Sequence, residues 1–380
     1  MIPNRQFIEY LQQEGVRFFT GVPDSLLKHI CACITSHVES NKHVIAANEG
    51  GAIALAAGYH LATGQIPLVY MQNSGLGNSV NPLLSLADPQ VYSIPMVLMI
   101  GWRGEPGAPD EPQHVKQGRV QNRLLESMEI PWAEIGPDTE NFSDVLRKLI
   151  QQAKTGKRPV ALVVRKGTFE PYQTHDNRNA NELMSREEAL GILLESLGDN
   201  DIVVSTTGMP SREIFELRAN RSAGHHRDFL TVGSMGHCSL IALGIAMHSK
   251  SRKVYCMDGD GALIMHMGAM AIIGNHATDN FRHVVINNGA HDSVGGQPTV
   301  GHSLDIPAIA RACGYRECRC VSGRTELEGA VRWLHGAHGP ALLEVKVKKG
   351  ARKDLGRPTR TPSENKDDLM NNLKMEQAGE

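Results

Sequence analysis

The sequence carries almost no excess charge and no long apolar run. Its 380 residues include 39 Lys and Arg against 41 Asp and Glu, a formal net charge of −2. Such a balance gives no overall attraction to nucleic acid or to anionic membrane surfaces. No apolar run is long enough to span a bilayer, and the first residues, MIPNRQFIEYLQQEG, are too polar for a signal peptide. We therefore expect a cytoplasmic protein.

Cysteine is scarce, and its spacing forms no recognisable motif. The seven cysteines are an odd number, and the closest pair, Cys318 and Cys320, has a C-x-C spacing. No second pair completes a zinc site of the usual spacing. The pattern favours free thiols in a reducing compartment.

The composition is that of a globular protein, and the pattern alternates between helix and strand. With 41% hydrophobic and 21% charged residues, the chain is long enough for two domains with full cores. The stretch RQFIEYLQQEG predicts a helix, and GGAIALAAGYHLATG predicts a helix buried all round. Short apolar runs suit central strands of parallel sheets covered on both faces, giving an α/β fold. These runs are VRFF, IPLVYMQ, IPMVLMIG, RPVALVVRK, DIVVSTTG, RKVYCMDG, FRHVVINN and PALLEVKVK.

The two halves of the chain resemble each other without gaps. A shift of 186 positions places Gly50 on Gly236, PLVYMQNSG on KVYCMDGDG, and PMVLMIG on FRHVVIN. We therefore expect two similar doubly wound parallel-sheet domains, an arrangement that often places a ligand between them. The expected boundaries are a first domain at 1–170, a polar linker at 171–183, a second domain at 184–350 and a charged polar tail at 351–380.

Two carboxylates stand between glycines in VYCMDGDGALIM, where a predicted strand meets a predicted helix. An EF-hand loop would need an acidic residue where Ala262 stands, and a dinucleotide fingerprint would need glycine in place of Ile264. A turn with solvated carboxylates suits Asp258 but not Asp260, which directly precedes the helix. The remaining interpretation is a site for a metal ion and phosphate.

A second strand end supplies further oxygen ligands. The run FRHVVINN ends in Asn287 and Asn288, 27 and 28 residues after Asp260. The helical stretch ALIMHMGAMAIIGN between them returns the chain to a neighbouring parallel strand, so both motifs lie at carboxyl ends of strands. Magnesium prefers such oxygen ligands together with phosphates, and a helix N-terminus favours the phosphates.

GDG followed by this spacer and NN resembles the motif of thiamine-diphosphate-dependent enzymes. These enzymes have a pyrimidine-binding and a diphosphate-binding domain of like topology, which would account for the repeat. The stretches GVPDS, QNSGLGNSVNPL, GWRGEPGAPDEPQH, STTGMPSRE and NNGAHDSVGGQPT are similar to the phosphonopyruvate decarboxylase family, as is the absence of a central third domain. The resemblance covers residues 1–350.

The resemblance implies a function and an assembly. The function is decarboxylation of 3-phosphonopyruvate in phosphonate biosynthesis, with no nucleic-acid or membrane partner. The enzyme would be a homodimer or larger homo-oligomer, with cofactor sites at subunit interfaces. Two alternatives stay open: a sulfopyruvate decarboxylase, and a non-catalytic protein that binds thiamine diphosphate.

The resemblance also implies the residues that bind thiamine diphosphate and Mg²⁺. The metal ligands would be Asp260, Asn288 and the carbonyl of Ala290. The spacer is one residue longer than usual, so Asn287 also remains a candidate. Cofactor contacts would come from Glu49, Gly233, Ser234, Met235, Gly259, Asp260, Gly261, Ala262 and Asn288.

Glu49 opens the small-residue helix in NEGGAIALAAG, where the resemblance places the catalytic glutamate. A carboxyl group at the aminopyrimidine ring helps the cofactor to lose its C2 proton, and burial would favour the protonated form of this carboxyl. Read without the resemblance, Glu49 is a helix-start acid stabilised by the dipole. Met235 matches Glu49 in the 186-residue register and would support the cofactor from below, while the Gly233 carbonyl would accept from the pyrimidine amine.

Three further residues are candidates for catalysis on the substrate side. Asp24 follows a strand, and its candidate roles are to guide protonation, to press against the leaving carboxylate, or to cap the helix SLLKHI. His114 could relay protons near neutral pH, and His291 lies just past the metal loop. The candidates for holding a phosphonate group are Arg103, Lys116 and Arg212.

Overall fold

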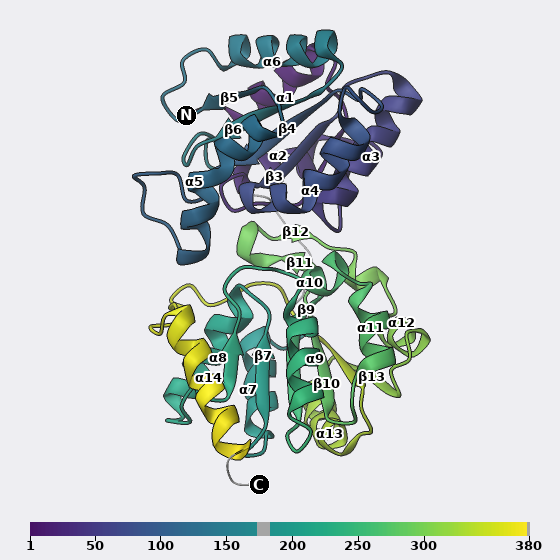
Figure 1. The fold of residues 1–380 in the computed structure, drawn as a ribbon, viewed down its shortest axis with the longest axis vertical. Helices are drawn as coiled ribbons and strands as arrows, with labels where there is room; N and C mark the ends of the chain where they lie inside the picture. The colour runs from purple at the N-terminus through teal and green to yellow at the C-terminus, as the bar shows by residue number, and fades with distance from the viewer. Residues whose placement is uncertain (173–182, 378–380) are drawn as a thin grey trace. The chain divides into compact units, whose positions relative to one another are not determined.

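The computed structural model describes residues 1–172 and 183–377 (Figure 1). The chain divides into two compact units, Met1–Asn177 and Arg178–Glu380. The division falls within the expected linker, most of which lies outside the described residues. Each unit contains one six-stranded sheet with helices on both faces.

The N-terminal unit is built on a wholly parallel sheet of order β2-β1-β3-β4-β6-β5. Side chains of α1, α2 and α6 pack on one face, and those of α3, α4 and α5 on the other. The strands are β1 (Phe19–Gly21), β2 (His43–Ile45), β3 (Leu68–Gln72), β4 (Met96–Gly101), β5 (Trp132–Ile135) and β6 (Pro159–Val164). The helices are α1 (Asn4–Gln13), α2 (Lys28–His37), α3 (Glu49–Thr63), α4 (Leu76–Pro82), α5 (Pro112–Ser127) and α6 (Phe142–Gly156).

The C-terminal unit repeats this plan with a parallel sheet of order β13-β14-β10-β9-β7-β8. Helices α7, α8 and α13 pack on one face, and α9 to α12 with α14 on the other. The strands are β7 (Ile202–Ser205), β8 (Asp228–Leu230), β9 (Val254–Gly259), β10 (Phe281–Asn287), β13 (Glu317–Val321) and β14 (Ala341–Lys346), with a small hairpin of β11 (Ala290–His291) and β12 (Gln297–Pro298). The helices are α7 (Arg186–Glu195), α8 (Met209–Asn220), α9 (Cys238–His248), α10 (Asp260–Met265), α11 (Ala269–His276), α12 (Ile306–Ala312), α13 (Arg324–Gly336) and α14 (Pro362–Gln377).

The expected internal repeat is confirmed at the level of topology. Read from the opposite edge, the second sheet runs β8-β7-β9-β10-β14-β13, which is the order of the first sheet strand for strand. Strand β3 begins at Leu68 and its counterpart β9 at Val254, a separation that agrees with the 186-residue register. The predicted fold, two similar doubly wound domains, is therefore correct.

Two helix predictions differ from the structure. The single helix expected after Asp260 is two helices, because His266 leaves the helical conformation (φ −132°, ψ 47°) where it packs against Gly236. Helix α3 is not buried all round, since Leu55 and Leu61 are 39% and 73% exposed. Its outward face carries only small and apolar residues: Gly51, Ala54, Leu55, Gly58, Leu61 and Ala62.

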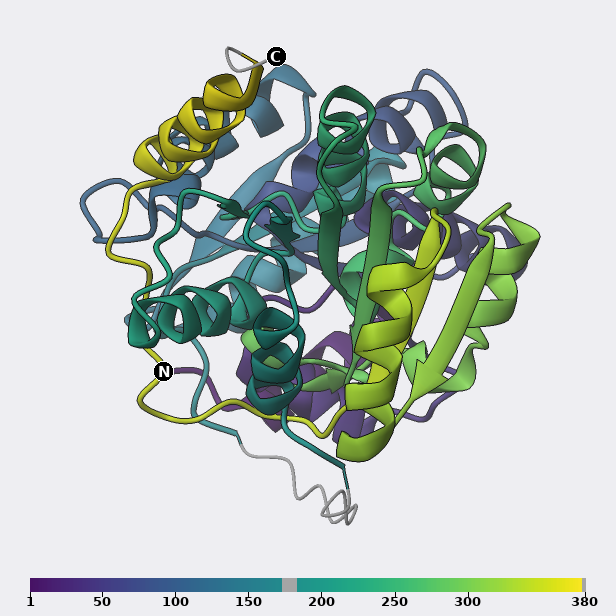
Figure 2. The same cartoon turned by 90° about the horizontal axis from the view of Figure 1, so that it is seen from below.

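The segment expected as a polar tail forms an ordered helix, α14, that packs on the edge strand β8 (Figure 2). Asn365 is buried there, and its side chain bonds the strand twice. Its Oδ1 accepts from the Leu230 N–H (3.0 Å) and its Nδ2 donates to the Asp228 carbonyl (2.7 Å). Leu369 enters the core beside it. The sequence did not predict this helix, because its composition is mostly charged and polar and only these few side chains face the core.

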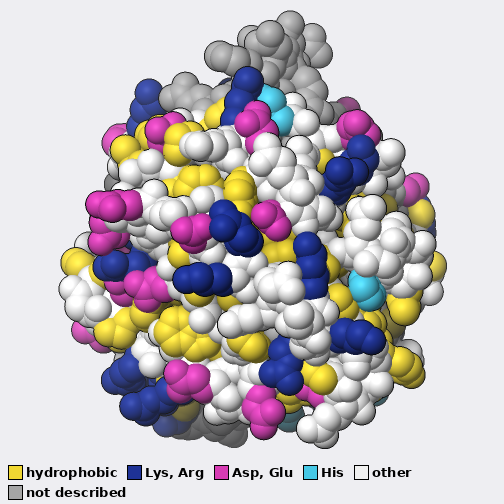
Figure 3. Space-filling model, turned by 90° about the horizontal axis from the view of Figure 1, so that it is seen from above, with side chains coloured by type: hydrophobic (Ala, Val, Ile, Leu, Met, Phe, Trp, Pro, Cys, Tyr) yellow, Lys and Arg dark blue, Asp and Glu magenta, His cyan; other side chains and the backbone are white. Residues whose placement is uncertain are grey.

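Surface charges of both signs are mixed on the face drawn in Figure 3, in agreement with the net charge of −2. Within the described part of the chain, no helix combines the length and apolar character that crossing a membrane requires.

Candidate active site

In both units, the predicted site residues gather beyond the carboxyl ends of the strands, where parallel α/β sheets bind ligands. In the N-terminal unit, Asp24, Glu49 and Arg103 follow β1, β2 and β4, and Gln72, which was not predicted, is the last residue of β3. In the C-terminal unit, the corresponding stretches follow β8, β9 and β10. Each unit therefore presents its own cluster.

Glu49 is a buried carboxylate at the first position of α3. The Asn48 side chain caps this helix by accepting from the Gly51 N–H (2.8 Å). The amide of Asn78 donates to Glu49 Oε2 (2.8 Å). A Cβ on Gly75 would lie 2.5 Å from Glu49 Cγ, so only glycine leaves room for this side chain. The sequence therefore shapes a dedicated niche for one carboxylate.

Asp24 is fully buried and closes the turn between β1 and α2. Its Oδ2 accepts from the backbone N–H groups of Leu26 and Leu27 (3.0 and 3.3 Å), and Gln72 Nε2 donates to its Oδ1 (2.6 Å). Burial raises the pKa of Asp24, although the bond from Gln72 opposes this shift. Because α2 begins only at Lys28, Asp24 caps the preceding turn rather than the helix itself. The prediction that Asp24 caps the helix SLLKHI is therefore wrong, and its turn-closing bonds are compatible with a site role.

Arg103 is committed to protein partners. Its guanidinium forms a two-pronged ion pair with Asp110, and its Nη1 donates to Ser25 Oγ (2.7 Å). The other two candidates for holding a phosphonate differ in setting. Lys116 is exposed on α5, and Arg212 is half-buried in α8 of the C-terminal unit.

His114 lies in the first turn of α5 and is half-buried. Burial lowers its pKa to about 4, with Arg103 acting in the same direction and Asp110 against it. Desolvation of the ring disfavours the imidazolium, so a relay through His114 would use the neutral ring, and its role as a proton relay stays a prediction.

Asp260 is buried at the start of the short helix α10. The Thr299 hydroxyl donates to its Oδ2. Burial raises the pKa of Asp260 to about 6, against the effects of Thr299 and of the Asn288 backbone N–H. Asp258 is not a solvated turn residue as expected: it is 1% exposed and lies 3.4 Å from His283 Nε2.

Asn287 and Asn288 point in different directions. A Cβ on Gly301 would lie 2.8 Å from Asn287 Oδ1 and 2.6 Å from Asp260 Oδ2, so these two oxygens face the same small space. The Asn287 amide also donates to Glu344 Oε1 (2.7 Å).

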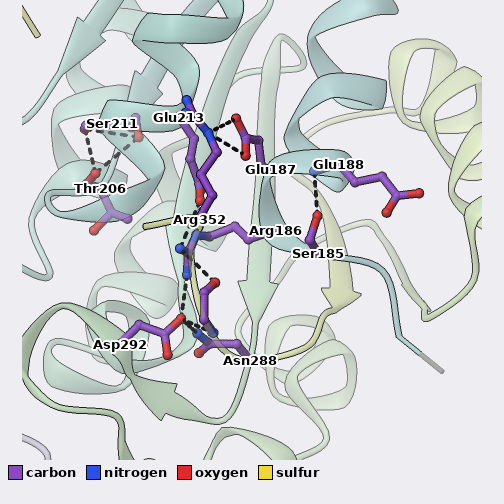
Figure 4. A network of polar contacts seen from close by, with 12 residues as sticks. Ser185, Arg186, Glu187, Glu188, Thr206, Ser211, Glu213, Asn288, Asp292 and Arg352 are labelled. Atoms are coloured by element: carbon purple, nitrogen blue, oxygen red, sulfur yellow. Dashed lines mark hydrogen bonds and ion pairs between the residues drawn. The ribbon is translucent and has the colours of Figure 1, made fainter. Parts of the chain in front are cut away.

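Asn288 is held on the other side by a network that reaches α7 and α8 (Figure 4). Its Nδ2 donates to Asp292 Oδ2 (2.7 Å), which also accepts from Arg186 Nη1 (2.8 Å). Arg186 completes a two-pronged pair with Glu213 (2.8 and 3.0 Å). Ala290, two residues after Asn288, is buried at the start of β11.

The stretch 233–236 is a tight turn beside α10. Positive φ angles occur at Gly233 (83°), Ser234 (48°) and Gly236 (84°), and the Gly233 N–H donates to Thr207 Oγ1 (2.8 Å). A Cβ on Gly261 would lie 3.0 Å from His291 Cε1 and 3.4 Å from Met235 Cε. The structure therefore brings Met235, Gly261 and His291 together. Burial lowers the pKa of His291 to about 4.

The side chains and backbone groups of the C-terminal cluster have the chemistry needed to bind magnesium and a diphosphate. Asp260, the asparagine amides and a backbone carbonyl are hard oxygen ligands of the kind that magnesium prefers. Gly259 and Gly261 flank Asp260 and leave its backbone open to close approach by a diphosphate. The partly buried Met235 offers an apolar surface beside them.

Comparison with known proteins assigns the chain to a family. Residues 4–125 match the family described as "Thiamine pyrophosphate enzyme, N-terminal TPP binding domain", and residues 206–345 match its C-terminal TPP binding domain. Phosphonopyruvate decarboxylase of Streptomyces viridochromogenes is 34% identical over 379 residues, which cover 96% of this chain and 93% of that protein. The chain belongs to the thiamine-diphosphate-dependent decarboxylase family. It is a thiamine-diphosphate-dependent 2-oxo acid decarboxylase.

Two other relatives cover the chain almost end to end. Phosphonopyruvate decarboxylase of Streptomyces hygroscopicus is 34% identical over 383 residues, covering 96% of this chain and 92% of that protein. Sulfopyruvate decarboxylase of Methanosarcina acetivorans is 26% identical over 371 residues, covering 92% of each.

Sequence reasoning missed several residues that shape these clusters. Gln72, Gly75 and Asn78 all lie in QNSGLGNSVNPL, which carries the family resemblance, but nothing local links them to Asp24 or Glu49. Thr299 and Gly301 lie 39 and 41 residues beyond Asp260, and only the fold of the β12 region brings them to it.

Proposed function

We propose that this decarboxylase acts on 3-phosphonopyruvate and releases carbon dioxide and phosphonoacetaldehyde, a step of phosphonate biosynthesis. The observation that carries the proposal is the 34% identity to two phosphonopyruvate decarboxylases over 96% of the chain, against 26% to the sulfopyruvate decarboxylase.

In this proposal, each cluster serves one part of the cofactor. Thiamine diphosphate, when bound, supplies the centre that accepts the electrons released on decarboxylation. Glu49, in its niche beside Gly75, would bond the aminopyrimidine ring and would favour loss of the C2 proton. The Gly233 carbonyl bonds the pyrimidine amine, and Met235 supports the rings.

The diphosphate end is held through magnesium. Asp260, Asn288 and the Ala290 carbonyl are the proposed ligands, and Asn287 remains an alternative to Asn288 because its oxygen faces Asp260. Backbone groups of the segment 259–262 contact the diphosphate. Burial of Asp260 supports this role. A buried carboxylate without a charged partner costs free energy, and a bound cation would supply that partner.

Asp24, His114 and His291 act on the substrate side. Asp24, buried and with a raised pKa, is suited to exchanging a proton. His114 and His291 remain neutral at pH 7 and can each donate one ring N–H while accepting at the other nitrogen. Arg103 contributes positive charge beside Asp24 and would bind a phosphonate only if its pairing with Asp110 rearranges.

We also propose that the enzyme is a homo-oligomer with cofactor sites between subunits. The outward faces of α3 and α9 support this. In the 186-residue register, exposed Ala54, Gly58 and Leu61 of α3 match exposed Leu240, Gly244 and Met247 of α9. Apolar helix faces repeated at equivalent positions are suited to burial against a second copy of the chain.

The principal rival is sulfopyruvate decarboxylation. The presence of both domains in one chain is no argument against this rival. The sulfopyruvate decarboxylase of Methanosarcina acetivorans is also a single chain that aligns with both halves of this one. The buried Glu49 in its niche argues against a protein that only binds the cofactor, since binding needs only the diphosphate and metal residues.

The test is a substrate panel on the purified full chain with thiamine diphosphate and Mg²⁺. Phosphonopyruvate, sulfopyruvate and pyruvate are offered in parallel, and aldehyde release is followed. A site built for a dianion leaves its donors unpaired with pyruvate, so we expect kcat/KM to fall from phosphonopyruvate to sulfopyruvate to pyruvate. The Glu49→Gln variant is the matched control: it should bind cofactor but lose turnover by about 100-fold or more.

A higher kcat/KM for sulfopyruvate would move the enzyme to the rival activity. Turnover of none of the three substrates, with cofactor shown to bind by calorimetry, would contradict both.

A further inference from the structure

A cluster of four potential metal ligands lies in the core of the C-terminal unit, outside the magnesium site. Cys238 is the first residue of α9, Cys256 and Asp258 lie on β9, and His283 lies on β10. His283 stands directly opposite Cys256 in the strand register. All four side chains are at most 1% exposed.

The distances within the cluster match a tetrahedral site for a metal with sulfur ligands. The two Sγ atoms are 3.8 Å apart, and His283 Nε2 is 3.4 Å from Asp258 Oδ2. The ligand atoms of Cys238, Cys256 and Asp258 all lie within 4.8 Å of one another. With Zn–S bonds of about 2.3 Å and Zn–N and Zn–O bonds of about 2.1 Å, a tetrahedron has an S–S edge of about 3.8 Å and an N–O edge of about 3.4 Å. Two opposite edges of that tetrahedron therefore already have the required length. His283 lies outside the set whose ligand atoms are all within 4.8 Å of one another, so its Nε2 must move closer to Cys238 to complete the site.

The surroundings also suit a structural metal. His283 Nδ1 is 2.9 Å from the Tyr315 hydroxyl, which orients the ring and leaves Nε2 to face the cluster. The neighbouring core side chains are apolar, among them Ala242, Leu243 and Phe281. A closed, dry, four-ligand site is typical of structural zinc, whereas magnesium avoids sulfur ligands.

We propose that Cys238, Cys256, Asp258 and His283 bind one thiophilic divalent cation, with zinc the expected ion. On binding, both thiols release their protons to solvent and bind as thiolates, and no electron is transferred. Cys238 follows the turn that contains Gly233 and Met235, while Asp258 directly precedes Gly259 and Asp260. The ion would therefore join the two stretches proposed to hold the cofactor.

The experiment measures bound metal on the full chain, expressed with zinc and purified with excess Mg²⁺. We expect about one zinc per chain by elemental analysis, because a closed four-ligand site holds one ion. Cys256→Ser should reduce the zinc content at least tenfold. The matched control is Cys33→Ser, a buried cysteine of the N-terminal unit that also lies near a histidine, and it should retain the zinc.

A second measurement keeps the proposal testable if Cys256→Ser fails to fold. Wild-type protein is stripped with a nitrogen-donor chelator in the presence of excess Mg²⁺, and is then given Co²⁺ or Zn²⁺. We expect a thiolate-to-cobalt charge-transfer absorption, and a lowered Tm that zinc restores and further magnesium does not. Wild-type protein that holds no zinc and develops no such absorption would overturn the proposal and leave a hydrogen-bonded thiol pair.

Discussion

At the scale of single residues, the two carboxylates proposed for the site of this decarboxylase are buried and each needs a glycine beside it. A Cβ on Gly75 would press on Glu49, and a Cβ on Gly301 would press on Asp260. Each carboxylate also accepts from a neutral side-chain donor, the Asn78 amide or the Thr299 hydroxyl. Each acid therefore requires a glycine at the neighbouring position, because any larger residue there would displace the carboxylate.

His114 provides a pH prediction at this scale. Its pKa of about 4 lies below the ordinary value of 6.5, so the unfolded chain binds more protons between these two values. Stability should therefore be lost as pH falls from about 6.5 to 4. Because the ring is partly exposed, we expect the loss to be on the order of 1 kcal/mol.

The measurement is an NMR titration of the histidine ring protons, with His114→Gln identifying the resonance. His114→Gln should also flatten the dependence of unfolding free energy on pH in that window, while His338→Gln, at an exposed position, should leave it unchanged. A ring that titrates near pH 6.5 would contradict the prediction.

At the scale of elements, the strands inside each six-stranded sheet were predicted from the sequence, and the strands at the sheet edges were missed. The eight predicted runs are the four inner strands of each sheet. The four missed strands, β2, β5, β8 and β13, are the four edges. Inner strands are buried on both faces and read as apolar runs, whereas the edges include exposed or charged residues such as Val44, Glu134 and Arg319.

Helix α14 protects one of these edges, and Asn365 is the contact to test. Asn365→Ala would leave the Leu230 N–H and the Asp228 carbonyl unpaired beneath the inward face of α14. We expect a loss of about 2–4 kcal/mol in the free energy of unfolding, from two unsatisfied buried groups. Urea denaturation measures this loss.

Asn371→Ala is the matched control, because Asn371 is exposed on the same helix. It should change stability by less than about 0.5 kcal/mol. Equal effects of the two substitutions would show that α14 does not stabilise β8 through Asn365.

At the scale of the whole molecule, the proposed oligomer can be tested on α3. Leu61 is 73% exposed, so Leu61→Glu should leave the fold of the unit intact. If the face of α3 packs on a second copy, the buried charge should shift the protein to a smaller species and reduce activity in parallel. Analytical ultracentrifugation and circular dichroism follow assembly and folding separately.

Val120→Glu on α5 is the control, since Val120 is also an exposed apolar residue on a helix. It should leave the assembly unchanged. An unchanged sedimentation coefficient for Leu61→Glu would place the interface, if there is one, away from this face.

Glu49 was predicted only through the family resemblance. The sequence by itself predicted the inner strands, the internal repeat and Asp260 as a metal ligand. Each of these depends on residues that are close in the chain: an apolar run, a fixed offset, or a carboxylate between glycines at a strand end. Thiamine diphosphate was implied by the resemblance of this motif, with its spacing to the asparagines, to that of thiamine-diphosphate-dependent enzymes.

Only the tertiary structure decided the edge strands, the docking of α14, the pairing of Arg103 with Asp110 and the lowered pKa of His114. It alone brought Cys238 to Cys256, two residues from different elements that match no spacing motif. These features depend on contacts between side chains that meet only after the elements pack. Burial and pairing, which set charge and reactivity, are properties of that packing and have no signature in the local sequence.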